Sequence, residues 1–332
     1  MNAELKSKLE KLRADFVEIG NPPFKHFYCP ILYRDEEAKL CKAHIVNRAF
    51  KNSSRKWTVQ REDVDLFFGS NFEADFVLLQ DGRELSVIDK LKDKRFSPSF
   101  YADGTQAKHY LAKSEVPPYF TPIEFNEEGK TIHVGLKMSP KELIKSQKKQ
   151  WSIDVIKDIR IASLVSLIKS AYLTLFDMMG YSYVLSAAGE FVGKKILGDF
   201  FLKNFKNTKR IVIKNANLFF KDFVHMVRPV QTCGFNFQGT ISDRMVLVCW
   251  GVSGSPWAVI VFIRTGQLIH SVMLPVFDQV DMISTFLDFL KNQNEKIKVI
   301  LCRYKKYKNI WESNKNHINL KWPKTGILFP CN

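Results

Sequence analysis

The sequence predicts an α+β fold, and three observations support that prediction. Residues 1–20 and 152–205 repeat apolar side chains with helical periodicity. Apolar runs separated by "SGS" and "TGQ" indicate antiparallel strands over 244–303. A short segment at 25–50, between the first helical stretch and the rest of the chain, gathers cysteine and histidine. We therefore expect a small N-terminal module and a larger C-terminal α+β region that contains an antiparallel sheet.

The N-terminal elements follow from periodicity and breakers. The first helix covers 1–20, and "GNPP" ends it because proline cannot continue a helix. Next, "FYCPILY" and "KLCKAHIV" predict a hairpin around "RDEEA". Residues 61–80 indicate helix at both ends with a break near Gly69. We expect a module at 1–80 and a loop-rich connection with short strands at 81–150, including one strand at 131–139.

The C-terminal region, 151–332, begins with the strongest helix of the chain. This helix covers 152–180, ends at Gly180 and is followed by another at 189–205. Lys169 and Asp177 lie inside its most apolar window, which favours a buried helix over a membrane span, and no membrane partner is expected. The N-terminus lacks the apolar core of a signal peptide, so a cytoplasmic location and reduced cysteines are the default expectation.

The charge points to a polyanionic partner. Lys and Arg number 50 against 34 Asp and Glu, which gives a formal charge of +16. A basic balance of this size predicts nucleic-acid binding, and the alternative is that the lysines are spread over solvated faces. Three basic runs, at 148–150, 203–210 and 303–308, provide the expected contacts: Lys148, Lys149, Lys209, Arg210, Arg303, Lys305 and Lys306.

Two short spacings suggest a zinc site. His26-x-x-Cys29 and Cys41-x-x-His44 supply four ligands of the types that zinc takes in a structural site. A hairpin across the eleven intervening residues would bring the two pairs together. The alternative is coincidence, with His26 exposed and Cys29 and Cys41 buried.

Parts of this region resemble the HNH, or ββα-metal, nucleases, whose module is of the treble-clef kind. "CKAHIVNRAF" resembles the first motif of that family, and "GSNFEADF" resembles part of its second segment. "SLIKSAYLTLFDMMGYSYVL" is similar to a helix of larger bacterial proteins that carry such modules. Two positions depart from the pattern: Ala43 stands where the family has an acidic residue before its histidine, and Leu66 stands where it has asparagine.

The resemblance implies a metal-dependent endonuclease, with defence against foreign DNA as one role open to it. His44 would be the general base, Asp65 would assist it, and Mg²⁺ or Mn²⁺ would stabilise the transition state. DNA is then the expected substrate ahead of RNA. His44 cannot be both base and zinc ligand; if it is the base, Asp65 or Glu62 replaces it around zinc.

Two other hypotheses stay open on the sequence alone. In the second, the module has lost catalysis, holds zinc and binds nucleic acid or a protein partner without cutting. In the third, the chain is an unrelated α+β scaffold in which cysteine and histidine are incidental. Metal analysis separates the third hypothesis from the others, and a cleavage assay separates the first from the second.

Overall fold

The computed structural model describes a discontinuous set of residues that falls into two compact units. The described residues are 2–50, 53, 55–77, 80, 99–102, 105–108, 124–125, 131–133, 159–229, 246–250, 256–266, 268–292, 296–305 and 310–321. One unit comprises Met1–Ala74 and Arg160–Asn332, and the other comprises Asp75–Ile159. The segments on either side of the second unit therefore belong to the same packed body.

The N-terminal helix α1 (Ala3–Glu18) follows the predicted stripe. Asn2 caps it, since its side chain accepts a hydrogen bond from the Glu4 amide at 2.8 Å. Leu5, Leu9, Leu12 and Phe16 on one side of the helix are buried. Burying this stripe fixes α1 against the rest of the unit, because an isolated helix of this length is only marginally stable in water.

The predicted hairpin between the segments around Cys29 and Cys41 is wrong, because the second of them pairs with a later strand. The strand β1 (Leu40–His44) pairs with β2 (Trp57–Arg61), which the sequence analysis did not identify, and not with the segment around Cys29. That segment contributes an isolated bridge between Tyr28 and Asp35 and then a tight turn. The missed strand carries "WTVQR", in which the alternation of Trp57 and Val59 is too short to stand out.

A helix follows the β1–β2 hairpin directly. The helix α2 (Glu62–Phe68) continues into the π-helical segment η1 (Gly69–Glu73) without the break that was predicted near Gly69. Gly69 keeps right-handed helical dihedrals, φ −59° and ψ −50°. The helix therefore continues through Gly69 as a π-turn with one extra residue and is not broken there. A hairpin followed by a helix is the order of a ββα unit.

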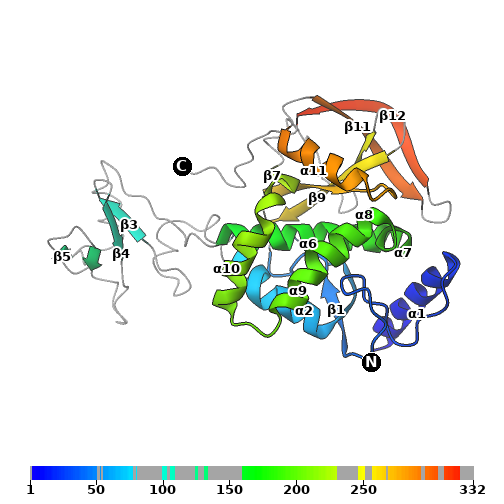
Figure 1. The fold of residues 1–332 in the computed structure, drawn as a ribbon, viewed down its shortest axis with the longest axis horizontal. Coiled ribbons are helices and arrows are strands. Elements are labelled where there is room, and N and C mark those ends of the chain that lie inside the picture. Colours follow the sequence, from blue (N-terminus) through cyan, green and yellow to red (C-terminus); the bar gives the residue numbers. More distant parts are fainter. Residues whose placement is uncertain are drawn as a thin grey trace. The chain divides into compact units, whose positions relative to one another are not determined.

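Helices form the centre of the larger unit (Figure 1). The long helix α6 (Ile159–Met179) ends at Gly180, which has φ +68° and was predicted as the stop. There follow α7 (Tyr181–Val184), α8 (Ala187–Glu190), the π-helical η2 (Phe191–Gly198) and α9 (Asp199–Asn204). Next come α10 (Lys209–Phe219) and two 3-10 turns, η3 (Phe220–Asp222) and η4 (Val224–Met226).

A six-stranded antiparallel sheet confirms the α+β class. It contains β7 (Val227–Pro229), β8 (Val246–Trp250), β9 (Pro256–Thr265), β10 (Leu268–Pro275), β11 (Lys296–Lys305) and β12 (Ile310–Lys321). The spatial order is β12-β11-β8-β9-β10-β7, so β8, β9 and β10 form the expected meander. The helix α11 (Met282–Asn292) connects β10 to β11, which pairs with the far side of β8.

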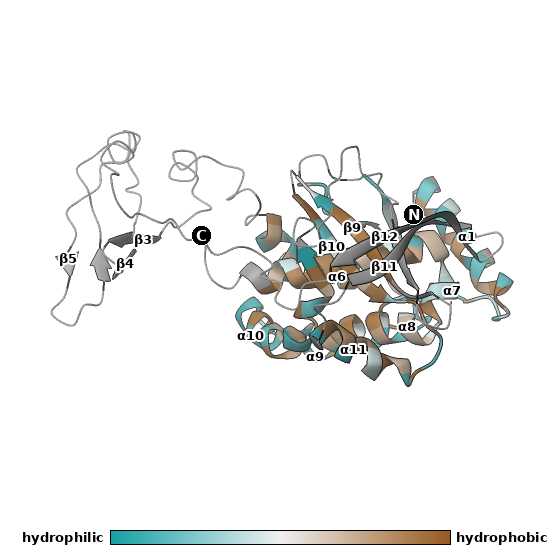
Figure 2. Cartoon of the chain, turned by 90° about the horizontal axis from the view of Figure 1, so that it is seen from above, coloured by the Kyte–Doolittle hydropathy of each residue, from teal (hydrophilic) through white to brown (hydrophobic). Residues whose placement is uncertain are grey.

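The helix α6 meets the length and hydropathy of a membrane span, and its surroundings are those of a core helix. The window Ile161–Met179 has a mean hydropathy of 1.4, and 89% of it is buried inside the protein. Figure 2 shows hydrophobic residues along most of this helix. One such helix, mostly buried, is weak evidence for a membrane.

The smaller unit contains two short hairpins within its described residues. In one, β3 (Ser99–Ala102) pairs with β4 (Thr105–Lys108). In the other, β5 (Glu124–Phe125) pairs with β6 (Thr131–His133). The strand predicted at 131–139 begins where β6 begins, and its positions 134–139 lie outside the described residues.

Candidate metal centre and nucleic-acid interface

Cys29 lies in a tight turn, and this turn contains no second cysteine. The Leu32 amide donates to Cys29 Sγ at 3.5 Å, and the Tyr33 amide donates to the Cys29 carbonyl at 2.8 Å. Tyr33 has φ +56°, the left-handed conformation such a turn requires. In a Cys-x-x-Cys metal knuckle the second thiolate stands three residues after the first, and here that position is Leu32.

The turn is fixed by tyrosine hydroxyls. Tyr172 of α6 donates to the Pro30 carbonyl at 2.5 Å, and Tyr181 of α7 donates to the Tyr28 carbonyl at 2.5 Å. A Cβ atom on Gly193 of η2 would lie 2.2 Å from the Tyr172 hydroxyl, so glycine is needed there for this close approach. Direct hydrogen bonds thus attach the turn to the helices.

The two members of the Cys41-x-x-His44 pair point to opposite faces of β1. Side chains alternate along a strand, and a spacing of three positions therefore separates them. Cys41 shares its face with its register partner Gln60, whereas His44 shares the other face with Trp57. One ion cannot be bound by both side chains while β1 keeps this conformation.

The four proposed zinc ligands are consequently not assembled into one site. Cys29 is fully buried, with its Sγ 3.1 Å from Gln60 Oε1, while His26 is half-buried and its backbone amide donates to Asp35 at 2.9 Å. Within the part of the chain that the structure describes, no group of three or more His, Cys, Asp or Glu side chains is arranged to hold a metal ion. The geometry of His26, Cys29, Cys41 and His44 therefore does not fit zinc.

A buried ammonium contacts Asp65, the residue that the resemblance suggested would assist His44. The Lys169 side chain of α6 has no exposed surface, and its Nζ lies 2.9 Å from Asp65 Oδ1 and 2.7 Å from Glu73 Oε1. Asn47 Nδ2 donates to the other Glu73 oxygen at 3.2 Å. We call Asn47, Asp65, Glu73 and Lys169 the Lys169 cluster. It joins the hairpin loop, α2, η1 and α6.

Electrostatics stabilise the charged form of Lys169. Burial lowers the pKa of its ammonium, but the carboxylates of Glu73 and Asp65 outweigh burial and hold that pKa above its ordinary value. Two carboxylates and one ammonium give the Lys169 cluster a formal charge of −1. Its Asp65 is the residue proposed to assist His44, and it is engaged by a cation of the protein itself.

Cys41 lies at the edge of this cluster as a thiol. Its Sγ lies 3.8 Å from Asp65 Oδ2. Burial, and after it the Asp65 carboxylate, raises the pKa of Cys41 to about 12. Burial likewise raises the pKa of Cys29 to about 11. Both side chains therefore stay protonated near neutral pH while no metal is bound.

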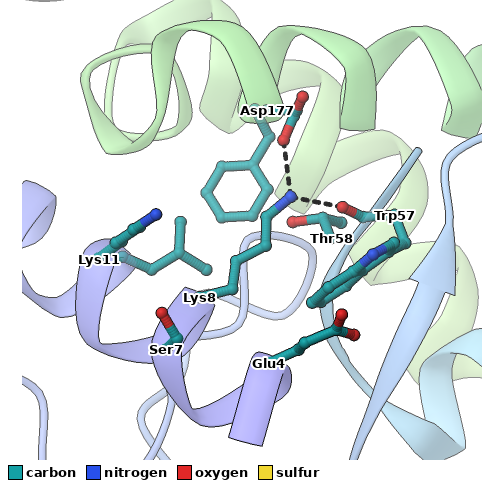
Figure 3. A pocket seen from close by; sticks show the side chains of 9 residues that line it. Glu4, Ser7, Lys8, Lys11, Trp57, Thr58 and Asp177 are labelled. Atoms are coloured by element: carbon teal, nitrogen blue, oxygen red, sulfur yellow. Dashed lines mark hydrogen bonds and ion pairs between the residues drawn. The ribbon is translucent and has the colours of Figure 1, made fainter.

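The helix α1 lies beside Trp57, the register partner of His44 (Figure 3). Lys8 donates to the Trp57 carbonyl at 2.5 Å and forms an ion pair with Asp177 of α6 at 2.8 Å. Lys8 and Lys42 both place ammonium groups about 4.9 Å and 4.8 Å from the Trp57 ring centre. The cleft here is lined by Glu4, Ser7, Lys8, Lys11, Leu12, Trp57, Thr58, Phe176 and Asp177. Lys8 crosses it and links three elements.

A basic surface lies on α9, α10 and the turn between them. Residues 199–222 hold six Lys or Arg and two Asp, a net charge of +4. We call its exposed cations the α10 basic surface: Lys203, Lys206, Lys209, Arg210, Lys214 and Lys221. Figure 2 shows hydrophilic and hydrophobic residues interleaved along α10. The predicted contacts Lys209 and Arg210 thus lie exposed in its first turn.

The other predicted nucleic-acid contacts are placed less fully. Arg303 and Lys305 belong to β11, with backbone register partners Glu312 and Ile310 on β12. Lys148, Lys149 and Lys306 lie outside the described residues. Only the α10 basic surface therefore provides side-chain geometry for an interface.

Comparisons with protein-family models, with curated proteins and with solved structures gave no match to this chain.

Lys169 was not predicted as a site residue; in the sequence it only indicated that its helix is buried and does not span a membrane. Its partners Asp65 and Glu73 lie 104 and 96 positions away in the chain. The available signal was a lone lysine in the most apolar helix of the protein. Such a lysine has to find carboxylate partners, because an unpaired buried charge is strongly unfavourable.

Proposed function

We propose that this chain is a nucleic-acid-binding protein whose ββα module resembles that of HNH nucleases and does not cut. The Lys169 cluster is the observation that carries the proposal. The Lys169 ammonium forms ion pairs with the carboxylates of Asp65 and Glu73 and so compensates part of their negative charge. Mg²⁺ and Mn²⁺ take oxygen ligands of the same kind, so Lys169 competes for the ligands that a catalytic ion needs.

The remaining ligands support the same conclusion. Leu32, and not a second cysteine, stands three residues after Cys29, and Cys41 and His44 lie on opposite faces of β1. An HNH centre needs its histidine to face the metal and the scissile phosphate, because general-base catalysis depends on direct reach to the attacking water. The order of hairpin and then helix supports a structural resemblance to the HNH module. The positions of Cys41 and His44 argue against catalysis.

Nucleic-acid binding is supported by the charge and by where it is displayed. The chain carries +16, and the α10 basic surface presents six of its cations to solvent with only two acids in the same segment. Lysine and arginine contacts to phosphates release counterions and need no sequence-specific site.

Cleavage and binding assays test the two halves of the proposal. We expect nucleic acid to be bound at low salt and to remain intact with Mg²⁺ or Mn²⁺. Affinity should fall steeply between roughly 50 and 200 mM salt. Metal-dependent cleavage that His44→Ala abolishes would instead establish the HNH enzyme. His26→Ala is the matched control, since both histidines are half-buried.

A further inference from the structure

An aromatic ring is presented to solvent within the α10 basic surface. Phe205, directly after α9, keeps 49% of its surface exposed. Its ring lies nearly parallel to that of Phe201, with centroids 5.4 Å apart and an interplanar angle of 16°. Phe201 is buried and packs edge-on against Phe67 of α2 at 5.1 Å. Phe205 is therefore an exposed ring that stacks on a buried one.

Hydrogen bonds fix the turn that carries this ring. Asn204 is 3% exposed and donates to the Phe200 carbonyl at 2.9 Å. Its Oδ1 accepts from Asn207 at 3.2 Å and from Asn215 of α10 at 2.7 Å. This asparagine network joins α9 to α10, so little conformational entropy is lost when a ligand contacts Phe205.

Cations surround the ring. The Lys206 ammonium lies over the Phe205 ring, 5.4 Å from the ring centre, so this side chain has to move aside toward a phosphate when a base stacks there. Lys203 precedes the ring by two residues, and Lys209 and Arg210 begin α10 just after the turn. The first turn of α10 carries no acidic residue, so the amide dipoles at its start add to the positive potential.

We infer that Phe205 and the cations around it form a binding site for single-stranded nucleic acid. This inference rests on the proposed function and specifies its ligand. A base stacks on the exposed ring while the flanking phosphates contact Lys203, Lys206 and Arg210. Alternation of aromatic and basic residues is the usual way of binding single strands without sequence preference. In a duplex the base faces are already stacked on each other, so Phe205 has no partner there.

An anionic membrane is the other ligand that such a surface suggests, because Leu202, Ile211 and Leu218 are also exposed. The geometry favours nucleic acid. Phe205 stacks on Phe201 at an interplanar angle of 16°, which fixes the orientation of its ring face. Single strands also use the ring face, whereas membrane insertion depends on apolar area of any shape.

The test compares a labelled oligothymidylate of about 20 nucleotides with a duplex of equal length, by fluorescence anisotropy at low salt. Phe205→Ala should weaken single-strand binding by about tenfold, since one base-aromatic stack is removed, and should leave duplex binding unchanged. Phe205→Trp should retain single-strand binding. Leu218→Ala, a truncation of another exposed apolar residue on the same surface, should change neither. Thermal melts establish that each variant is folded at the assay temperature.

The outcomes separate this inference from the proposed function. If neither oligonucleotide binds at low salt, the proposed function fails and the inference fails with it. If both bind and Phe205→Ala weakens them equally or not at all, only the inference is overturned. Binding to anionic phospholipid vesicles that Phe205→Ala and Leu218→Ala both weaken, without a single-strand preference, overturns it in favour of a membrane surface.

Discussion

Lys169 is the residue on which the interior of the ββα region depends most. Its removal leaves Asp65 and Glu73 as adjacent carboxylates without a cation, and Glu73 is largely buried. We expect Lys169→Met to lower the free energy of unfolding by about 3–5 kcal/mol, the usual effect of breaking a buried ion pair from one side. Urea denaturation at neutral pH measures the change.

A double variant provides the control for this prediction. Lys169→Met combined with Glu73→Gln removes one of the two stranded charges, so it should recover part of the lost stability. Lys8→Met removes a lysine whose ion pair with Asp177 is more exposed, 27% and 14% of the two side chains, and should have a smaller effect. Equal losses in Lys169→Met and Lys8→Met would contradict the role assigned to burial.

The two cysteines near the hairpin make stability depend on alkaline pH. In the folded chain the pKa of Cys29 is about 11 and that of Cys41 about 12, above the ordinary 9.0. Below pH 9 both thiols are protonated in the folded and unfolded chains, so their contribution is fully present. As pH rises from 9 toward 12 the unfolded chain ionises first, and stability is lost.

Alkylation provides the site-specific measurement. Near pH 9, iodoacetamide should modify Cys41 in the folded chain far more slowly than in the urea-unfolded chain, although Cys41 is only partly buried. Peptide mass spectrometry resolves the site. Equal rates in both states at that pH would show that the Cys41 thiol has an ordinary pKa.

At the same scale, the sequence identified two members of the Lys169 cluster but not their pairing. The resemblance pointed to Asp65, and the apolar window pointed to a buried Lys169. Their pairing could not be inferred, because about a hundred residues separate them and no local pattern encodes a contact at that range. The zinc expectation failed to fit for a local reason: alternation along β1 separates Cys41 from His44, and this becomes clear only once β1 is known to be a strand.

Among the elements, the junction of α6 and α7 is constrained by both backbone conformation and a close contact. Gly180 has φ +68°, and a Cβ atom there would lie 2.0 Å from Asp15 Oδ2. That carboxylate accepts a hydrogen bond from the Tyr181 amide at 2.8 Å and so caps α7 from α1. The φ and ψ of Gly180, +68° and −146°, also lie in a region that essentially only glycine adopts. Gly180→Ala should therefore lower the free energy of unfolding by more than the roughly 1 kcal/mol that a left-handed alanine costs.

Gly20 is the matched control for Gly180. It also has a positive φ, +89°, but an added Cβ would meet nothing within 4 Å. Gly20→Ala should show the backbone effect alone, on the order of 1 kcal/mol. If the two variants unfold at the same urea concentration, the contact between Gly180 and Asp15 does not contribute to stability.

Elements with a long repeat or a clear stop were predicted well. The stripe of α1, the end of α6 at Gly180 and the meander of β8, β9 and β10 each follow from patterns of ten residues or more. The five-residue strand β2 was missed, and with it the true partner of β1. The short strand β7 and the long strand β12 were missed too; the run "IWESNKNHINLK" of β12 is too polar to be recognised from hydrophobicity alone.

At the scale of the whole molecule, contacts between distant segments hold the N-terminal region in place. Tyr172, Tyr181, Lys8 and Lys169 each join that region to another element of the larger unit. These contacts connect residues up to 74 with residues from 160 onward, and the second unit lies between these two segments in the sequence. The sequence suggested a separable module at 1–80 because sequential order was the only guide to proximity.

Chelation tests whether a metal contributes to that packing. Since direct hydrogen bonds and ion pairs fix the turn at Cys29, we expect protein treated with EDTA to melt at the same temperature as untreated protein. Tyr172→Phe, which removes the bond to the Pro30 carbonyl, should instead lower the free energy of unfolding by about 1–2 kcal/mol. A structural zinc would act in the opposite way, because its binding energy is folding energy and its removal unfolds the region around it. A large fall in melting temperature with EDTA, together with release of one zinc per chain, would contradict the metal-free account of this fold.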